Sequence, residues 1–506
     1  MKNRLKQSKK NIAYGLSFKI VIMLLEFISR YYFIQYLGIE LLGVNGVFTN
    51  IIQFLSIAEL GMNNVVMYSY YKPLAEHDET KLASLNSFYR KIYNGIALSV
   101  ACIGLFFIPF LGYIIKTDYE IPYITLVYLL FLADTVISYV CVYKVAILIA
   151  DQNAYIGTRY DIILSIIRTV IQILSLILYK NYVLYLCIKI LFSILGNFLK
   201  VKKVEKEYLF TNRKGILPNK DRKEILHTVK SGFIYKLSAI FLNCTDNILI
   251  SIIVGTVWVG ALSNYVTLCT AVASFVFIIY NNMTASVGNL VATEGKEKRF
   301  EVFNIMSVTS NWIALVCFTC MLILCDDFLS IWLGSSFVMD FSVVLPKVMM
   351  LYISCVMQPI FSYREALGLY TKTKYVMLLA VIINIVLSVI LGIYFGISGI
   401  LIASLIAVLV TYFWYEPLIL HRDCFGVAVK SYYKRIIFNI MLCGIISAIL
   451  KFFCDCWVVT GWFDFLLKGI TVFVITNIVG VIVYCKTKEF EYITKKLFRK
   501  KIKIFS

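Results

Sequence analysis

Two short stretches, Leu37-Gly-Ile-Glu-Leu-Leu-Gly-Val44 and Val254-Gly-Thr-Val-Trp-Val-Gly-Ala261, share one pattern of glycines and apolar residues. A shift of 217 residues aligns them, and the same shift matches three further residues, so that Gly15, Lys19 and Leu25 recur as Gly232, Lys236 and Leu242. Glycines and a lysine at constant spacing inside apolar segments indicate that the chain is duplicated. The second half would then repeat the helices of the first.

The composition of the 506-residue chain excludes a large soluble protein. Hydrophobic residues make up 60% of it, charged residues 15%, and the mean hydropathy is +0.82. Because a membrane-spanning helix needs about 20 apolar residues, this content suffices for roughly fourteen or fifteen spans. The segments are continuously apolar, whereas the strands of a membrane β-barrel alternate apolar and polar residues.

The apolar runs predict an all-α integral membrane protein with about fourteen transmembrane helices. These centre on residues 12–37, 42–70, 92–115, 122–147, 160–179, 182–199, 231–254, 258–289, 302–325, 347–363, 375–393, 397–418, 436–453 and 464–485. The first and seventh helices run in the same direction, so the duplication predicts two parallel six-helix repeats related by a pseudo-two-fold axis along the membrane normal. The last two helices are an addition.

This arrangement predicts four parts of the chain. They are an N-terminal six-helix lobe at 1–200, a basic cytoplasmic linker at 201–230, a C-terminal six-helix lobe at 231–420, and at 421–506 the last two helices with a basic cytoplasmic tail. We expect the two lobes to face each other across a central cavity.

The net charge is +20, and the distribution of the basic residues along the chain indicates the membrane topology. With the N-terminus in the cytoplasm, 38 Lys and Arg residues, Arg364 among them, lie in cytoplasmic loops and termini, and four lie in loops on the external side of the membrane. Because cytoplasmic loops carry the excess of Lys and Arg, this asymmetry predicts a multi-pass protein with both termini in the cytoplasm. It also disfavours a nucleic-acid partner.

No catalytic or metal-binding motif is apparent. The 14 cysteines are scattered singly, and His77, His227 and His421 are predicted to lie in cytoplasmic loops, so the sequence predicts no metal site. Every loop is short, and there is no phosphate-binding loop, Ser-His-Asp set or zinc motif. The sequence therefore predicts a transporter without a cofactor and not an enzyme.

Charged residues within the apolar segments are the candidate functional residues, because a charge at the bilayer centre costs about 2.5–3.5 kcal/mol and usually faces protein or water. We expect a cationic substrate-binding cavity formed by Lys19, Arg30, Arg168 and Lys236, in which the repeat would place Lys19 and Lys236 opposite each other. Polar residues predicted to line the same cavity are Asn45, Thr49, Gln53, Asn243, Asn247, Asn264 and Asn281. Candidate carboxylates for a coupling cation are Glu26, Glu59, Asp134 and Asp246.

Structural roles are open for several of these residues. Glu26 and Arg30 are four residues apart and could form an ion pair that locks the first helix. Asp134 could be a hydrogen-bonding residue in the packing, and Arg168 could reach headgroup water together with Asp161. Two further lysines in the apolar segments are less informative, since long side chains can snorkel to the interface; these are Lys144 and Lys189.

Six motifs carry a family resemblance. Near the N-terminus these are Arg30-Tyr-Tyr-Phe-Ile-Gln-Tyr-Leu-Gly-Ile-Glu-Leu-Leu-Gly43, Ala58-Glu-Leu-Gly-Met-Asn-Asn-Val65 and Tyr71-Lys-Pro-Leu-Ala75. The second half contains Arg364-Glu-Ala-Leu-Gly-Leu-Tyr370, Phe395-Gly-Ile-Ser-Gly-Ile400 and Trp414-Tyr-Glu-Pro417. Over residues 10–485 the chain resembles the bacterial polysaccharide flippases of the multidrug/oligosaccharidyl-lipid/polysaccharide exporter superfamily.

This resemblance implies two helical bundles that work by alternating access in the bacterial cytoplasmic membrane. It implies a polyprenyl-diphosphate-linked oligosaccharide as substrate, moved from the inner to the outer leaflet for cell-surface polysaccharide synthesis. Expected partners are membrane lipids, a coupling cation such as Na⁺ or H⁺, and proteins of glycan synthesis and polymerisation. Two alternatives are open, namely a cation-coupled multidrug exporter of the same superfamily and a membrane glycan polymerase or ligase.

Overall fold

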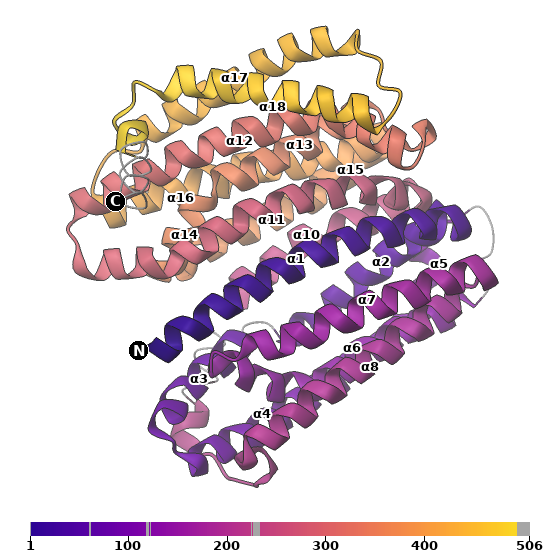
Figure 1. The fold of residues 1–506 in the computed structure, drawn as a ribbon, viewed down its shortest axis with the longest axis vertical. Helices are drawn as coiled ribbons and strands as arrows, with labels where there is room; N and C mark the ends of the chain where they lie inside the picture. The colour runs from indigo at the N-terminus through magenta and orange to yellow at the C-terminus, as the bar shows by residue number, and fades with distance from the viewer. Residues whose placement is uncertain are drawn as a thin grey trace. The chain divides into compact units, whose positions relative to one another are not determined.

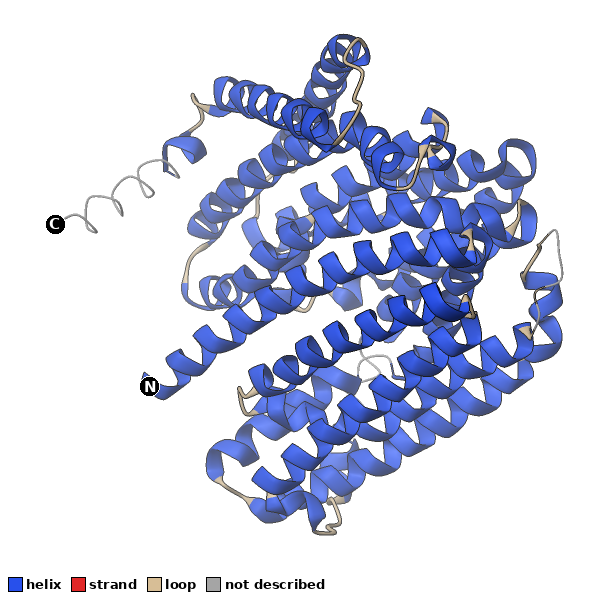
Figure 2. Ribbon diagram, turned by 45° about the vertical axis from the view of Figure 1, so that its right-hand side comes forward, coloured by secondary structure: helices blue, strands red, loops and turns tan. Residues whose placement is uncertain are grey.

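The computed structural model describes residues 2–59, 62–117, 121, 123–223, 225 and 233–492. Within these ranges the chain forms helices joined by short loops, without a β-strand (Figure 2). The chain divides into two compact units, Met1–Gly260 and Ala261–Ser506. The predicted all-α fold class is therefore confirmed, while the predicted boundaries of the lobes and the linker stay a prediction.

The first unit contains ten α-helices and the first turn of an eleventh among the described residues (Figure 1). They are α1 (Lys2–Leu37), α2 (Ile39–Leu55), α3 (Met62–Glu76), α4 (Glu79–Phe106), α5 (Leu111–Ile114), α6 (Ile124–Ala150), α7 (Ala154–Tyr179), α8 (Tyr182–Glu207), a short helical segment at 219–223, α10 (Phe233–Ile253) and the start of α11 (Thr256–Thr293). Helix α1 lies along α7, α6 packs between α4 and α8, and α2 packs against α6 and α10.

The second unit contains the rest of α11 and seven further α-helices. They are α12 (Lys296–Trp332), α13 (Phe341–Val356), α14 (Gln358–Leu367), α15 (Tyr370–Val410), α16 (Tyr412–Leu420), α17 (Lys430–Asp455) and α18 (Trp462–Tyr484). A π-helical turn at His421–Phe425 follows α16. Helix α12 packs against α13 and also against α17 and α18, which are the two additional C-terminal helices of the sequence prediction.

Eleven helices of the described chain are long and apolar enough to cross a membrane, or twelve if α13 and α14, bent by 47°, count as one span. The predicted number of fourteen is not confirmed. Helix α2 has only 17 residues, so the predicted helix at 42–70 is not one continuous span. The stretch Tyr370–Phe425 counts as one candidate of 56 residues, although Gly396, with φ of 60°, breaks it between the two predicted helices.

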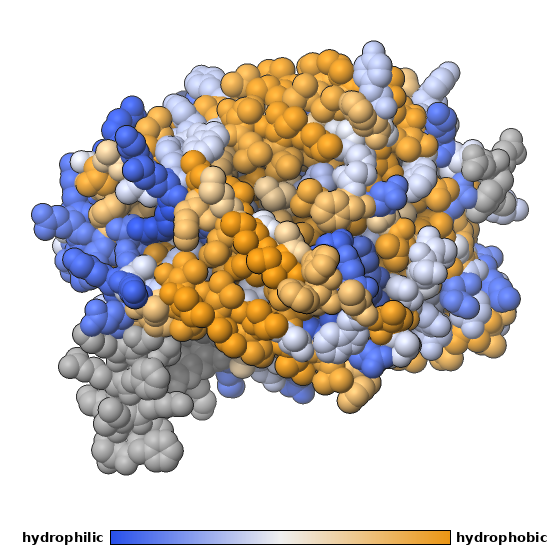
Figure 3. Space-filling model, turned by 90° about the horizontal axis from the view of Figure 1, so that it is seen from above, coloured by the Kyte–Doolittle hydropathy of each residue, from blue (hydrophilic) through white to orange (hydrophobic). Residues whose placement is uncertain are grey.

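The surface of the helices is largely apolar, as expected of a protein in lipid. Apolar residues cover large parts of the face in Figure 3. On α7 one stripe of exposed aliphatic side chains includes Ile163, Val170 and Leu174, while Asp161, Arg168 and Gln172 follow the opposite stripe. Helix α7 therefore turns its apolar face outward and its polar face toward its neighbours in the first unit.

The two glycine motifs that the 217-residue shift aligns lie against each other in the first unit. Gly38 and Gly255 both have positive φ, 85° and 132°. A Cβ on Gly43 would collide with the carbonyl oxygen of Thr256, and a Cβ on Gly260 would collide with that of Ile39. Under the shift Ile39 corresponds to Thr256 and Gly43 to Gly260, so the contact is reciprocal, as a two-fold relation requires.

Candidate functional site

The polar faces of α1, α7 and α8 meet at Tyr185. Its hydroxyl lies 3.2 Å from the hydroxyl of Ser29 on α1, and its carbonyl oxygen accepts a hydrogen bond of 3.0 Å from Gln172 on α7. Phe33 packs edge-on against its ring, with 5.3 Å between the ring centroids. Three helices thus hold this tyrosine in place.

Three of the predicted site residues are charged neighbours of the Tyr185 hydroxyl. They are Arg30 and Glu26 of α1 and Arg168 of α7. Arg30 and Arg168 are half-buried, whereas Glu26 is exposed. The Tyr185 hydroxyl is therefore subject to the charges of two guanidinium groups and one carboxylate, with an excess of positive charge.

Arg168 also lines a cavity of about 150 Å³ between α7 and α8. The polar lining residues are Asp161, Ser165, Arg168, Ser193, Asn197 and Lys200. Lys200 is paired with Asp161 at 2.9 Å, but the Nε of Arg168 is shielded from solvent and has no hydrogen-bond partner within the described residues. A buried N–H without a partner is costly, and an anionic oxygen would satisfy it.

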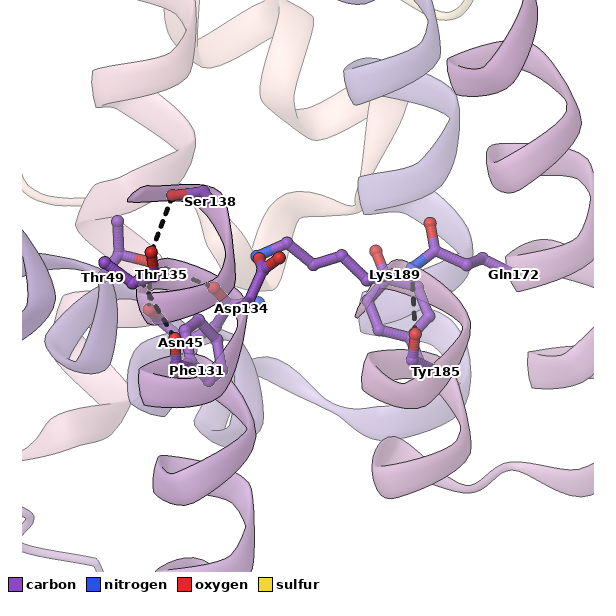
Figure 4. A network of polar contacts seen from close by, with 9 residues as sticks. All are labelled: Asn45, Thr49, Phe131, Asp134, Thr135, Ser138, Gln172, Tyr185 and Lys189. Carbon is purple, nitrogen blue, oxygen red and sulfur yellow. Dashed lines mark hydrogen bonds and ion pairs between the residues drawn. The ribbon is translucent and has the colours of Figure 1, made fainter. Parts of the chain in front are cut away.

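Two lysines of the apolar segments are paired with acids on neighbouring helices. Lys189 on α8 lies 3.5 Å from Asp134 on α6, and Lys144 on α6 is paired with Glu205 on α8. Figure 4 shows the Lys189 side chain reaching across to Asp134, with Asn45 and Thr49 of α2 beside this part of α6. Because Lys189 balances its charge, the Asp134 carboxylate is a weak candidate for binding a coupling cation.

The remaining predicted residues lie at varied depth. Lys19 and Lys236 are half-buried on α1 and α10, and their opposition stays a prediction, as does the cavity between the lobes. Among the polar residues, Asn264 is fully buried, Asn45 and Asn247 are half-buried, and four are exposed, namely Thr49, Gln53, Asn243 and Asn281. Glu59 and Asp246 are half-buried, and Glu59 lies beside the Tyr139 hydroxyl.

The second unit holds a buried charge pair that sequence reasoning missed. Both Nη1–Oε distances between Arg364 on α14 and Glu416 on α16 are short, 3.0 and 2.9 Å, and the two residues are 7% and 2% exposed. The guanidinium also lies 4.4 Å from the Phe361 ring centroid. The predicted loop position of Arg364 is wrong because it lies in α14, where a carboxylate from a distant part of the chain compensates its burial; its cytoplasmic side stays a prediction.

The predicted loop position of His421 is also wrong, while its cytoplasmic side stays a prediction. It is 1% exposed in the π-helical turn after α16, where its Nδ1 lies 2.8 Å from the carbonyl oxygen of Pro417 and its ring contacts Phe303 and Tyr432. His77 does lie in a turn, between α3 and α4, and His227 lies outside the described residues. No group of three His, Cys, Asp or Glu side chains in the described ranges is arranged to hold a metal ion.

Comparison with solved structures identifies the fold. The lipid II flippase MurJ in an inward closed conformation superimposes with a TM-score of 0.63 at 16% identity, over 93% of this chain and 99% of that chain. An inward-facing MATE multidrug-resistance transporter of the MOP superfamily gives 0.55 at 13% identity, over 79% and 96% of the two chains. The fold of this chain is similar to that of these two proteins.

A mutant of the Vibrio cholerae MATE transporter VcmN is a further match, with a TM-score of 0.56 at 13% identity, over 85% of this chain and 99% of that chain. No protein-family model and no curated protein sequence matches the chain. At these identities the likeness shows the fold alone, which is that of a multi-pass membrane protein. The superfamily that the sequence motifs indicate has this fold, and the similar structures include a lipid II flippase as well as MATE transporters.

Proposed function

We propose that this chain is a flippase that moves a polyprenyl-diphosphate-linked oligosaccharide from the inner to the outer leaflet of the bacterial cytoplasmic membrane. The observation that carries the proposal is the cationic group of Arg30 and Arg168 at Tyr185, next to the polar cavity of α7 and α8. A guanidinium binds phosphate through two parallel N–H donors, which makes Arg suited to a diphosphate.

The rest of the substrate fits the same surroundings. Ser165, Ser193 and Asn197 line the cavity and offer hydrogen bonds to phosphate or sugar hydroxyls, and the exposed aliphatic face of α7 adjoins lipid, where a polyprenyl tail would stay. The proposal includes alternating access between two lobes, with Lys19 and Lys236 contributing further positive charge.

The membrane potential favours this transport. Moving an anion out of an inside-negative compartment gains about 2.3 kcal/mol per charge per 100 mV, so a diphosphate with two charges gains roughly 4–5 kcal/mol. Antiport of Na⁺ or H⁺ would add to this, and Glu26, Glu59 and Asp246 are the candidate carboxylates. Asp134 is the least suitable because Lys189 lies beside it.

A cation-coupled drug exporter is the second candidate, and the MATE neighbours favour it. A cavity for cationic drugs would be expected to present an excess of carboxylates, whereas the group around Tyr185 has two arginines and one glutamate. Inactive variants distinguish the two functions. If the protein is a flippase, an inactive variant loses glycan export and keeps dye resistance. If it is a drug exporter, an inactive variant loses dye resistance and keeps glycan export.

Leaflet-resolved detection of the carrier-linked glycan tests the proposal. In spheroplasts that lack the protein, we expect the glycan to be inaccessible to an impermeant oxidant, and expression of the protein to make it accessible. Arg168→Gln should abolish this rescue, while dye efflux should not change. Precursor that is already outside without the protein would contradict the proposal and favour a polymerase or ligase.

A further inference from the structure

The segment at 208–223, which follows α8, is held against the first half of α4 by hydrogen bonds. The side-chain amide of Asn86 donates a hydrogen bond of 3.0 Å to the carbonyl oxygen of Thr211, and the Gly215 N–H donates one of 3.1 Å to the Ser87 hydroxyl. A Cβ on Gly215 would lie 2.7 Å from the Ser84 backbone nitrogen. The segment therefore lies too close to α4 to admit a side chain at this point.

Ion pairs fix the same segment at two further places. Arg213 is paired with Glu79 at 2.7 Å, and Lys81 with Asp221 at 3.3 Å. Both acids are thus already paired with basic residues. The charge distribution predicts that this end of the first unit lies on the cytoplasmic side of the membrane.

Between the segment and α4 there is a cavity of about 270 Å³. Its lining consists of Ser87, Phe88, Lys91, Ile92, Gly215, Ile216, Leu217 and Arg222. Two of these residues are cationic and none is acidic. The Nε of Arg222 is shielded from solvent and has no hydrogen-bond partner among the described residues, and Lys91 is exposed, so the cavity has two cationic lining residues and no acidic lining residue.

The rim of this cavity is apolar on one side. Ile216 is 84% exposed, whereas the next residue, Leu217, is 2% exposed and anchors the segment. Leu209, earlier in the segment, is 65% exposed. Exposed aliphatic side chains beside basic residues, at the cytoplasmic end of a transmembrane helix, are typical of the membrane interface with anionic lipids.

A neighbouring cavity of about 310 Å³ in the same unit has the opposite charge. Its lining includes Glu79, Asp151 and Glu207 and no Lys or Arg. Burial raises the pKa of Tyr208, so its hydroxyl stays protonated and donates to Asp151 at 2.6 Å. Two of these acids are paired, Glu79 with Arg213 and Glu207 with Lys203. The lining still offers no Lys or Arg to a phosphate, so an anion near this end of the unit would prefer the cavity of Lys91 and Arg222.

We propose that the cavity of Lys91 and Arg222 binds the headgroup of an anionic phospholipid from the cytoplasmic leaflet. The phosphate oxygens accept hydrogen bonds from Arg222 and Lys91, and the Ser87 hydroxyl is close enough to take part. Ile216 and Ile92 lie against the glycerol and the first methylene groups. This site is separate from the cationic group at Tyr185, and it does not depend on the transported substrate.

Native mass spectrometry of the full-length protein, released from nanodiscs that contain phosphatidylglycerol in phosphatidylcholine, tests the site. We expect the double variant Lys91→Gln/Arg222→Gln to bind phosphatidylglycerol at least tenfold more weakly. The matched control is Lys214→Gln/Lys220→Gln, which removes the same charge from exposed positions of the same segment outside the cavity. We expect it to stay within twofold of the parent protein.

Two further measurements distinguish a specific lipid site from unspecific attraction and from a site for free phosphate. Arg222→Lys keeps the charge but loses the planar donor group, and it should weaken binding about threefold. Inorganic phosphate at millimolar concentration should not displace the lipid. Equal losses in the two double variants would mean unspecific attraction, and displacement by phosphate would mean a site for free phosphate. Either result would overturn the proposal.

Discussion

Two arginines within the membrane helices have opposite surroundings. Arg364 in the second unit is 7% exposed and forms short contacts with both carboxylate oxygens of Glu416. Arg168 in the first unit is half-buried and lines a cavity between α7 and α8. The first arginine is compensated by the protein itself. The second lines a cavity in which, under the proposed function, the substrate would accept its hydrogen bonds, so burial of charge alone does not identify a functional residue.

The largest effect on stability is expected when the ion pair of Arg364 and Glu416 is broken. Glu416→Gln leaves the Arg364 charge buried without a counter-charge, which should lower the free energy of unfolding by about 3–5 kcal/mol. Thermal unfolding of the purified protein in detergent measures this. Glu365→Gln, at the exposed neighbouring position, is the control and should leave the unfolding temperature unchanged. A stable Glu416→Gln protein would show that the pair is not structural.

A smaller effect is expected for substitution of Arg168, and it should affect transport and not stability. Arg168→Gln should lower glycan export at least tenfold, which corresponds to about 1.4 kcal/mol, because the anionic group loses its guanidinium partner. Its unfolding temperature should stay within the scatter of the parent protein. Arg159→Gln, an exposed position on the same helix, controls for the change of net charge. Loss of stability equal to that of Glu416→Gln would remove the distinction between the two arginines.

The smallest effect is expected for the half-buried pair of Asp134 and Lys189, 3.5 Å apart. Asp134→Asn and Lys189→Gln should each destabilise the protein by roughly 1 kcal/mol, and the double variant should lose less than the sum of the two. Unfolding of all four proteins measures this coupling. Export by Asp134→Asn should keep its dependence on the cation gradient, and loss of that dependence would make Asp134 a coupling site after all.

Features that depend on the local chain could be predicted from the sequence. Gly38 and Gly255 have the positive φ that glycine adopts without strain, and Gly43 and Gly260 allow the close approach of two backbones. A break between the predicted helices 375–393 and 397–418 is present at Gly396. These signals are visible because each residue type carries its own conformational requirement.

Features that depend on distant partners could not be predicted. Lys189 could have snorkelled to the interface, and only the position of α6 shows that it pairs with Asp134. Arg364 and Glu416 are 52 residues apart, and His421 is buried because aromatic side chains of α12 and α17 surround it. The sequence does contain one signal for the polar contacts of α8. At helical spacing, one face of α8 carries Tyr185, Lys189, Ser193 and Lys200.

The reciprocal contact of Gly43 and Gly260 limits how α2 can move against the start of α11. At this crossing a carbonyl oxygen of each helix occupies the space where a side chain would begin. Any side chain at either position would meet that oxygen, so both positions require glycine. Backbone contact therefore sets the spacing of α2 and the start of α11, and a variant such as Gly43→Ala would have to separate the two helices.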